Sequence, residues 1–330
     1  MRFENAVKQQ TAPWFMKEDQ IASRLDAVPP RARPHAEELI RDGVTRIRDT
    51  VPRAVCTELI ERFKAFARAN PDKFAKHLDR DGHYPRIINL HAAVPQLCGL
   101  FSRNEKALEV QKAMFGADPC LYTSLFYERG SAQDFHRDTP FFTTKPEYFY
   151  FGVWVALEDA DESNGALKVI RGGHAIPESD REAIAAKMFR DGNVPAASNP
   201  LWDAYQADVR LRCNAAGLKE ELLFAEAGDT IIWHPQLPHG GGGIGDISRS
   251  RFSFVMHTTP LGVPVYHMDK FFRPNAPAPI DSRYKYAKHD GAYVVHHDGV
   301  DFGHQEVFPV GDFVQLDPPA KSWVQKLFRK

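Results

Sequence analysis

The sequence lacks a charge excess and a long apolar run. Its 42 Lys and Arg residues nearly balance 43 Asp and Glu residues, which leaves a formal net charge of −1. Such a balance provides no global attraction for nucleic acid or anionic lipid. No stretch approaches the roughly 18 apolar residues that a membrane-spanning helix needs, and the initial MRFENAVKQQ has no apolar signal segment. We therefore expect no membrane span and no nucleic-acid partner.

Cysteine is scarce, with four residues in a chain of 330. Cys56, Cys98, Cys120 and Cys213 are irregularly spaced and form no CxxC pair, so the sequence predicts neither a zinc ribbon nor a disulfide framework. Reduced thiols are typical of the cytoplasm, which is the expected location. The composition, 43% hydrophobic and 26% charged, is that of a globular protein with ample material for a core.

Changes in residue composition and periodicity divide the chain into four parts. Residues 1–34 mix charge, proline and isolated aromatics, and are expected to form an extended arm. Helical periodicity over residues 35–118 predicts a helical flank with one buried face. Residues 119–262 hold short β-branched and aromatic runs, which predict a sheet-rich core with a helical insertion at 177–222. Residues 263–330 are expected to form an extension packed on this core.

Two features of that extension have competing interpretations. His296, His297 and His304 lie close together in a turn-rich stretch without an ordered carboxylate partner, so we expect a solvated loop rather than a metal site. The final AKSWVQKLFRK has the pattern of a short basic amphipathic helix. Such a helix suits a membrane surface or a partner, but a helix docked on its own domain, or a frayed tail, is the simpler interpretation.

Two histidines and one aspartate have the spacing of metal ligands. His136 and Asp138 form an H-x-D pair after the predicted strand LYTSLFY, and alternation along an extended chain places both side chains on one side. His239 follows the predicted strand DTIIW and precedes four glycines, which allow close backbone approach. Two imidazoles and one carboxylate form the facial triad of non-haem Fe(II) sites, which leaves positions open for other ligands. We therefore predict an Fe(II) site.

An arginine follows the second histidine by twelve positions. Arg251 opens the predicted strand RFSFVMH, so its guanidinium could reach the metal pocket and hold a carboxylate in a bidentate pair. Arg249 has the same parity but lies in the polar GDISRS connection, where an arginine is more often solvated. We favour Arg251 and retain Arg249 as the alternative.

The ordered motifs resemble the phytanoyl-CoA dioxygenase family of Fe(II)/2-oxoglutarate oxygenases. These motifs are H-x-D from His136, WVALEDADESNGALKVI from Trp154, G-G-H ending at His174, AGDTIIW ending at Trp233, and HGGG from His239 ahead of an arginine. The resemblance covers roughly residues 120–258, and a weaker similarity to the family lies at residues 41–44.

The resemblance implies roles for individual positions. His136, Asp138 and His239 would bind iron, and Arg251 would hold the distal carboxylate of 2-oxoglutarate. Trp154 matches a tryptophan that lines this pocket. Further candidates for the cosubstrate site are Thr139 and Gly241. Two positions depart from the family pattern, because Arg171 replaces the usual proline before the G-G-H motif and Gly241 replaces a small hydroxyl residue. The resemblance assigns architectural roles to the Asn164-Gly165 turn and to His174.

The implied fold is a double-stranded β-helix, a cupin-like jelly roll, with the N-terminal helices packed on one sheet. The implied protein is a dioxygenase that uses Fe(II), 2-oxoglutarate and O2 to hydroxylate or desaturate a small organic substrate, with release of succinate and carbon dioxide. Two alternatives remain open: a zinc-dependent hydrolase on the same ligands, and a jelly-roll protein that binds a metabolite without catalysis. Composition leaves monomer and homodimer equally open.

Several residues are candidate substrate contacts. The segment YPRIINLHAAVP and positions near the predicted site supply Arg86, Asn89, His91, Arg171 and Trp233. Solvated or capping roles compete with substrate contact at the first three.

Overall fold

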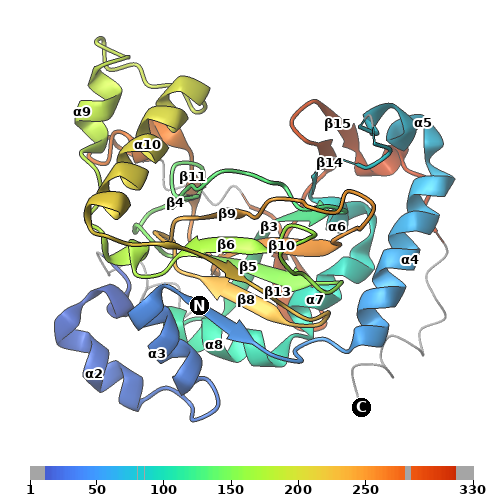
Figure 1. Ribbon diagram of the computed structural model, residues 1–330, viewed down its shortest axis with the longest axis horizontal. Helices are drawn as coiled ribbons and strands as arrows, with labels where there is room; N and C mark the ends of the chain where they lie inside the picture. The colour runs from blue at the N-terminus through green and yellow to red at the C-terminus, as the bar shows by residue number, and fades with distance from the viewer. Residues whose placement is uncertain (1–11, 80, 85, 279–283, 317–330) are drawn as a thin grey trace.

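The largest element of the computed structural model is a ten-stranded sheet; residues 12–316 are described, apart from 80, 85 and 279–283. Its strands are β1 (Val44–Ile47), β2 (Ile87–Ile88), β3 (Pro119–Tyr127), β5 (Phe151–Ala156), β8 (Thr230–Trp233), β10 (Ser253–Pro260), β12 (Tyr286–His289), β13 (Ala292–Val295), β14 (Gly299–Phe302) and β15 (Glu306–Pro309). The main path runs β1-β8-β5-β10-β3-β2-β14-β15, with β13 between β3 and β12 (Figure 1). Neighbours are antiparallel except β13 and β3.

A three-stranded antiparallel sheet packs against one face of the large sheet. It consists of β7 (Glu220–Leu223), β6 (Leu167–Ile170) and β9 (His239–Gly241), in that order. Val169 of the small sheet belongs to the same buried cluster as Trp154 and Ile231 of the large one. Trp154 stands opposite Val255 of β10 and Ile231 of β8. The two sheets thus share one core layer. A separate two-stranded ribbon joins β4 (Thr143–Thr144) and β11 (Val265–Tyr266).

Helices cover the other face of the large sheet (Figure 1). The main ones are α3 (Arg33–Asp42), α4 (Arg53–Ala69) and α8 (Glu105–Phe115), and shorter ones are α5 (Pro71–Phe74), α6 (Leu90–Ala93) and α7 (Gly99–Ser102). Helix α11 (Met268–Phe271) packs elsewhere, in a buried cluster with Leu201 and Tyr205. In α4, Leu59, Ile60 and Phe63 recur at helical spacing and are buried, with Phe63 packed on Phe126 of β3 at 4.5 Å between ring centroids. The predicted buried helix face is therefore confirmed.

The extended-arm prediction is wrong for residues 12–34. They form a short 3-10 helix (Trp14–Met16), α2 (Glu18–Asp26) and the start of α3. Trp14 and Phe15 are buried, and Phe15 stacks on Phe151 of β5 at 5.5 Å. The sequence suggested an extended arm because the residue on which Phe15 packs, Phe151, lies far away in the sequence.

The predicted flank and extension both contribute strands. β1 and β2 lie in the predicted helical flank, and β12 to β15 extend the large sheet from the C-terminal side. The predicted insertion contains α9 (Arg181–Ala186) and α10 (Asn199–Ala215), as Figure 1 shows, although its last residues belong to β7. The basic C-terminal segment lies outside the described residues. In the described part of the chain, no helix is long and apolar enough to cross a membrane.

Candidate metal centre

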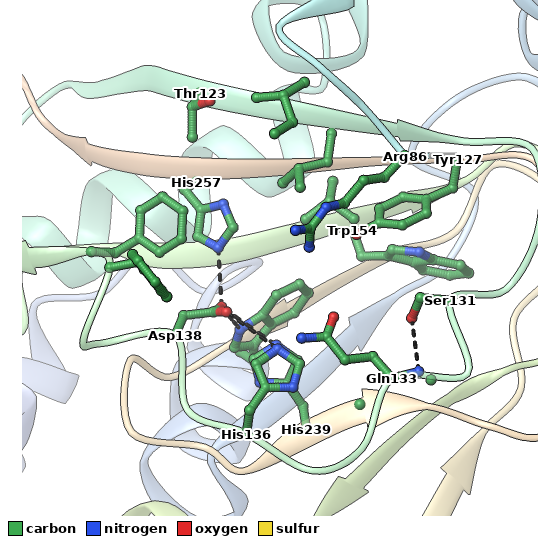
Figure 2. A pocket seen from close by; sticks show the side chains of 18 of the residues that line it. Arg86, Thr123, Tyr127, Ser131, Gln133, His136, Asp138, Trp154, His239 and His257 are labelled. Carbon is green, nitrogen blue, oxygen red and sulfur yellow. Dashed lines mark hydrogen bonds and ion pairs between the residues drawn. The ribbon is translucent and has the colours of Figure 1, made fainter. Parts of the chain in front are cut away.

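His136, Asp138 and His239 converge at one buried point between the sheets (Figure 2). His136 and His239 face each other across an antiparallel bridge, in which each backbone N–H donates to the other residue's carbonyl at 2.9 and 3.0 Å. Asp138 follows two positions later on the same segment as His136. One potential ligand atom from each residue lies within 4.8 Å of the others. The backbone thus brings together the three residues that the sequence predicted.

Backbone carbonyls orient both imidazoles. His136 Nδ1 lies 2.8 Å from the carbonyl of Asp134, and His239 Nδ1 lies 3.0 Å from that of Leu237. Because a carbonyl only accepts, each Nδ1 carries the proton, and in the neutral ring Nε2 is the bare nitrogen. These Nε2 atoms lie 3.5 and 3.4 Å from the carboxylate of Asp138. Such outer hydrogen bonds are typical of metal-binding histidines.

The glycines after His239 allow a close backbone approach. A Cβ on Gly240 would lie 2.6 Å from the carbonyl of Gln133, and one on Gly241 would lie 2.7 Å from the amide nitrogen of Ala132. Contacts this short would force the two segments apart and widen the bridge between His136 and His239. The glycines therefore accommodate the ligand-bearing backbone itself.

A third histidine, which the sequence analysis missed, holds the carboxylate. His257 Nε2 lies 3.0 Å from Asp138 Oδ2, and Trp233 Nε1 donates to the same oxygen at 3.3 Å. Phe142 stacks on the His257 ring at 3.7 Å. Alternation along β10 could have revealed this residue, because His257 has the same parity as Arg251.

The electrostatics favour an ionised carboxylate and neutral imidazole. Burial alone would raise the pKa of Asp138, but the electrostatic effect of the neighbouring His239 and His257 and the hydrogen bond from His257 hold this pKa well below its usual value. Burial lowers the pKa of His239 to about 4, against the opposing effect of Asp138. Both groups are therefore in the protonation state that metal binding requires at neutral pH.

Arg251 is a buried cation beside this cluster. Its guanidinium donates to the carbonyls of Gly165 and Arg129 at 3.0 and 3.2 Å, and lies over the ring of Trp154 at 5.5 Å. Its Nε has no hydrogen-bond partner, and no carboxylate pairs with it, among the described residues. Burial lowers the pKa of Arg251 to about 10, so it stays charged at neutral pH.

Arg249 points elsewhere. It pairs with Asp161 at 2.9 and 3.0 Å and also contacts Ser163. Of the two arginines that the sequence left open, only Arg251 lines the cavity at the cluster.

A cavity of about 430 Å³ opens in front of the three predicted ligands. The predicted residues Trp154, Trp233, Gly241, Arg251 and Arg86 line it. Its other walls are largely aromatic and include Tyr122, Tyr127, Phe141, Phe142 and Trp202. The structure thus gathers most of the predicted site, together with aromatics that the sequence analysis did not select.

Four predicted site residues have contacts outside this cavity: Thr139, Asn89 and Arg171, described here, and His91, described below. Thr139 is buried, and its Oγ1 forms hydrogen bonds with the hydroxyl of Tyr150 and the carbonyl of Pro235, both at 2.9 Å. Asn89 has a left-handed φ of 58°, and its side chain accepts from Thr123 Oγ1 at 2.7 Å. Arg171 pairs with Asp42 and Glu221 at the surface. Each has a structural partner that its position in the sequence did not reveal.

His174 and the histidines of the C-terminal part, His296, His297 and His304, also have protein partners. His174 Nε2 donates to the carbonyl of Ile40 at 3.0 Å, as its expected structural role requires. His296 is exposed, and His304 is exposed at the cavity mouth. The solvated-loop prediction is wrong for His297. This residue is half-buried, and its Nε2 lies 2.6 Å from the carbonyl of Tyr122.

His91, a predicted substrate contact, is instead buried away from the cavity. Its Nδ1 lies 2.6 Å from Ser124 Oγ, and burial, aided by His297 and His289, lowers its pKa to about 3. The unfolded state, with an ordinary histidine pKa, therefore binds the additional proton between about pH 6.5 and 3, and stability is lost as the pH falls through this window.

Replacing His91 with asparagine should reduce the acid sensitivity of the fold. Between pH 7.5 and 5.0 the unfolding free energy of the wild type should fall by on the order of 2 kcal/mol more than that of His91→Asn. Urea unfolding at both pH values measures the difference. His296→Asn, at an exposed position, is the control and should resemble the wild type. Equal slopes in wild type and His91→Asn would contradict the prediction.

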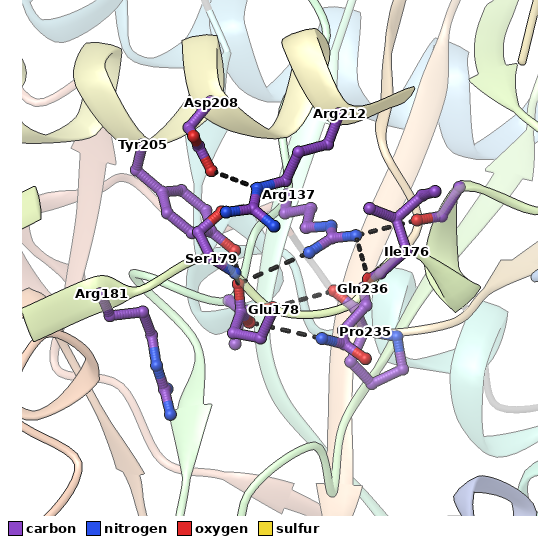
Figure 3. A network of polar contacts seen from close by, with 12 residues as sticks. Arg137, Ile176, Glu178, Ser179, Arg181, Tyr205, Asp208, Arg212, Pro235 and Gln236 are labelled. Carbon is purple, nitrogen blue, oxygen red and sulfur yellow. Dashed lines mark hydrogen bonds and ion pairs between the residues drawn. The ribbon is translucent and has the colours of Figure 1, made fainter. Parts of the chain in front are cut away.

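Helix α10 holds the segment between two predicted ligands. Arg137 is buried between them, and its backbone N–H donates to Gln206 Oε1 at 2.9 Å while Gln206 Nε2 donates to its carbonyl at 3.0 Å. The Arg137 side chain turns away from the cavity to the carbonyls of Gly173 and Ile176 and to Glu178 (Figure 3). Tyr205 of α10 also donates to Glu178, at 2.8 Å.

Replacing Gln206 with leucine should weaken Fe(II) binding by about 10- to 100-fold, because loss of an outer support releases the segment that carries His136 and Asp138. The Fe(II) dissociation constant, measured anaerobically by competition with a chelator, tests this. Asn214→Leu, at an exposed site on the same helix, should leave the constant unchanged. An unchanged constant in Gln206→Leu would show that the segment holds its geometry without α10.

Comparison with known proteins identifies relatives of this arrangement. The family model of phytanoyl-CoA dioxygenase (PhyH) matches residues 39–250. A phytanoyl-CoA dioxygenase domain-containing protein 1 of Danio rerio is 28% identical over 177 residues, covering 50% of this chain and 54% of the relative. A peroxisomal phytanoyl-CoA dioxygenase of Bos taurus is 27% identical over 115 residues, covering 35% and 30%. The chain therefore aligns with about half or less of these relatives' length.

Solved structures show the same fold at low sequence identity. The non-heme alpha ketoglutarate dependent epimerase SnoN from nogalamycin biosynthesis has a TM-score of 0.52 at 14% identity, covering 84% of this chain and 99% of its own. The carbocyclase SnoK from the same biosynthesis has a TM-score of 0.54 at 13% identity, covering 77% and 93%. Because the family model spans well over half of the 330 residues, the chain belongs to the phytanoyl-CoA dioxygenase family.

Proposed function

We propose that this protein is an Fe(II)- and 2-oxoglutarate-dependent oxygenase that hydroxylates or desaturates a small organic molecule. The observation that carries the proposal is the placement of Arg251, which is buried and has no carboxylate partner among the described residues, in the same cavity as His136, Asp138 and His239. SnoN has been crystallised with Fe3+ and alpha ketoglutarate, and the present chain shares its fold with a TM-score of 0.52.

We further propose that the two sheets form a double-stranded β-helix. The run β8-β5-β10-β3 opposite β7-β6-β9, together with the bridge from His136 to His239, supports two facing four-stranded layers. In that arrangement the metal ligands lie at one end of the small sheet.

The donor set fits the proposed groups. Two neutral imidazoles and one carboxylate suit Fe(II), and the unpaired Arg251 guanidinium suits the distal carboxylate of 2-oxoglutarate. When bound, Fe(II) and 2-oxoglutarate supply the means of O2-dependent oxidation of a C–H bond, with succinate and carbon dioxide as co-products. His257 and Trp233 hold Asp138, Arg251 orients the cosubstrate against Trp154, and the aromatic walls limit access of water.

The hydrolase alternative is less well supported. A zinc hydrolase on the same ligands needs a general base near the bound water. Among the described residues that line the cavity, Asp138 is the single carboxylate, and it is already a proposed ligand. A hydrolase would also leave Arg251 without an evident purpose.

Anaerobic titration with Fe(II) and 2-oxoglutarate tests the proposal. The wild type should develop the weak visible charge-transfer band of Fe(II)-bound 2-oxoglutarate, and His136→Ala should lose it. Succinate formation in air then separates an oxygenase from a non-catalytic metabolite-binding protein. Absence of the band in well-folded wild type would overturn the proposal.

A further inference from the structure

A second arginine faces the cavity and pairs with no carboxylate among the residues that the structure describes. Arg86 immediately precedes β2, is half-buried and lines the cavity, where Figure 2 shows its guanidinium beside Tyr127 and facing the Asp138 side. Among the described residues its polar contact is the hydroxyl of Tyr127, which also lies near Arg251, and no acidic side chain pairs with it. A half-buried charge with so little compensation favours an anionic ligand.

The charges of the proposed complex leave Arg86 unbalanced. Fe(II) and Arg251 together bring three positive charges, and Asp138 and the two carboxylates of 2-oxoglutarate bring three negative charges. Asp138 is the single acidic side chain among the described residues that line the cavity. Arg86 therefore adds a positive charge that neither the described residues lining the cavity nor the cosubstrate neutralises.

The rest of the cavity suits an apolar body. Trp202 lies 5.1 Å from Phe141 and 5.7 Å from His136 between ring centroids, so aromatic side chains extend up to the proposed metal ligands. Phe142 lies flat against His257 and continues this wall. A cavity of about 430 Å³ is in the usual range of about 300 to 1,000 Å³ for small-molecule sites.

We infer, on the basis of the proposed function, that the substrate is a small organic anion whose carboxylate or phosphate pairs with Arg86 and whose apolar or aromatic body lies along Phe141, Phe142 and Trp202. The planar guanidinium fork matches the oxygens of either anion. Because the Tyr127 hydroxyl lies near both arginines, the anionic end of the substrate would be next to the cosubstrate.

Calorimetric titration of the anaerobic protein, saturated with Fe(II) and 2-oxoglutarate, tests this inference with three probes. The probes 3-phenylpropanoate and 2-phenylethyl phosphate are anions, and 3-phenylpropanamide is their neutral counterpart. The wild type should bind at least one anion about tenfold or more tighter than the amide, as expected for charge-assisted hydrogen bonds. The better anion indicates whether carboxylate or phosphate is the natural group.

Arg86→Gln should remove this preference by weakening anion binding while leaving amide binding unchanged. Arg53→Gln, which changes an exposed arginine paired with Asp159, should retain the preference. Equal affinity for all probes in wild type, absence of anion binding at millimolar concentration, or a preference that survives in Arg86→Gln would overturn the inference. So would an Arg86→Gln variant whose defect is confined to 2-oxoglutarate, because Arg86 would then serve the cosubstrate.

The visible band of the Fe(II) and 2-oxoglutarate complex separates two kinds of failure. If the wild type forms the band and shows no anion preference, only the substrate inference fails. If the band does not form, the proposed function is wrong. The charge count that leaves Arg86 without a counter-charge then no longer applies, because it assumes bound Fe(II) and 2-oxoglutarate.

Discussion

Succinate formation should fall by more than about a hundredfold when Asp138 is replaced with alanine. Loss of an outer support alone costs about 10- to 100-fold in metal affinity or activity, and Asp138 is the proposed anionic ligand itself. Its removal also deprives His257 and Trp233 of their shared acceptor and leaves three histidines around an uncharged site. Anaerobic Fe(II) titration and a succinate assay measure both losses.

Asp134→Ala is the matched control. Asp134 lies on the same segment, and its exposed carboxylate pairs with Arg210 and Lys168. Its backbone carbonyl, which orients His136, remains in the alanine variant. Fe(II) affinity should therefore stay near that of the wild type. Succinate formation at the wild-type rate in folded Asp138→Ala would exclude Asp138 from the metal site.

Replacing Arg251 with methionine should raise the KM for 2-oxoglutarate by about a hundredfold or more while leaving Fe(II) affinity nearly unchanged. Breaking a buried charge pair costs about 3 to 5 kcal/mol, and no carboxylate in the described part of the chain pairs with Arg251 in the free state. In the protein without ligands, methionine breaks no ion pair among the described residues, so any lowering of the melting temperature should come from the two lost hydrogen bonds to the carbonyls of Gly165 and Arg129.

Thermal unfolding distinguishes a loss of cosubstrate binding from a loss of protein stability. Saturating 2-oxoglutarate with Fe(II) should raise the melting temperature of the wild type, because ligand at a hundred times its Kd stabilises by about 2.7 kcal/mol. Arg251→Met should lose most of this increase at the same concentrations. Arg249→Met, which breaks the ion pair with Asp161, should keep it. A wild-type KM in Arg251→Met would assign the cosubstrate carboxylate to another residue.

The sequence allowed prediction of the features that depend on local order. The H-x-D pair lies on one short segment, whereas His239 follows 101 positions after Asp138; the order of the motifs along the chain, not local spacing, predicted that it joins the cluster that the structure contains. The buried stripe of α4 followed from helical periodicity. Preference for Arg251 over Arg249 followed from its position at the start of an apolar strand, and the contacts of the two side chains agree with it.

Features that depend on distant partners were not predictable in this way. Thr139 is adjacent to a predicted ligand, but its hydroxyl meets Pro235, 96 positions away. His91 is buried on Ser124 of a strand that no local pattern pairs with it. Trp14 and Phe15 lie in a segment without helical periodicity. Their position is set by packing in the core between the helices and the large sheet. Side-chain direction in such places is set by tertiary packing, which overrides local propensity.

Helix α10 links two properties that could otherwise evolve separately. Trp202 on its first turn forms part of the cavity wall, and Gln206, one turn later, holds the backbone between His136 and Asp138. A substitution that tilts or shifts this helix to admit a different substrate would also disturb the segment that carries two metal ligands. Movements of this helix that would change substrate specificity are therefore limited by the need to keep the metal bound. Substitution of a single side chain such as Trp202 changes the cavity without moving the helix, and is less restricted.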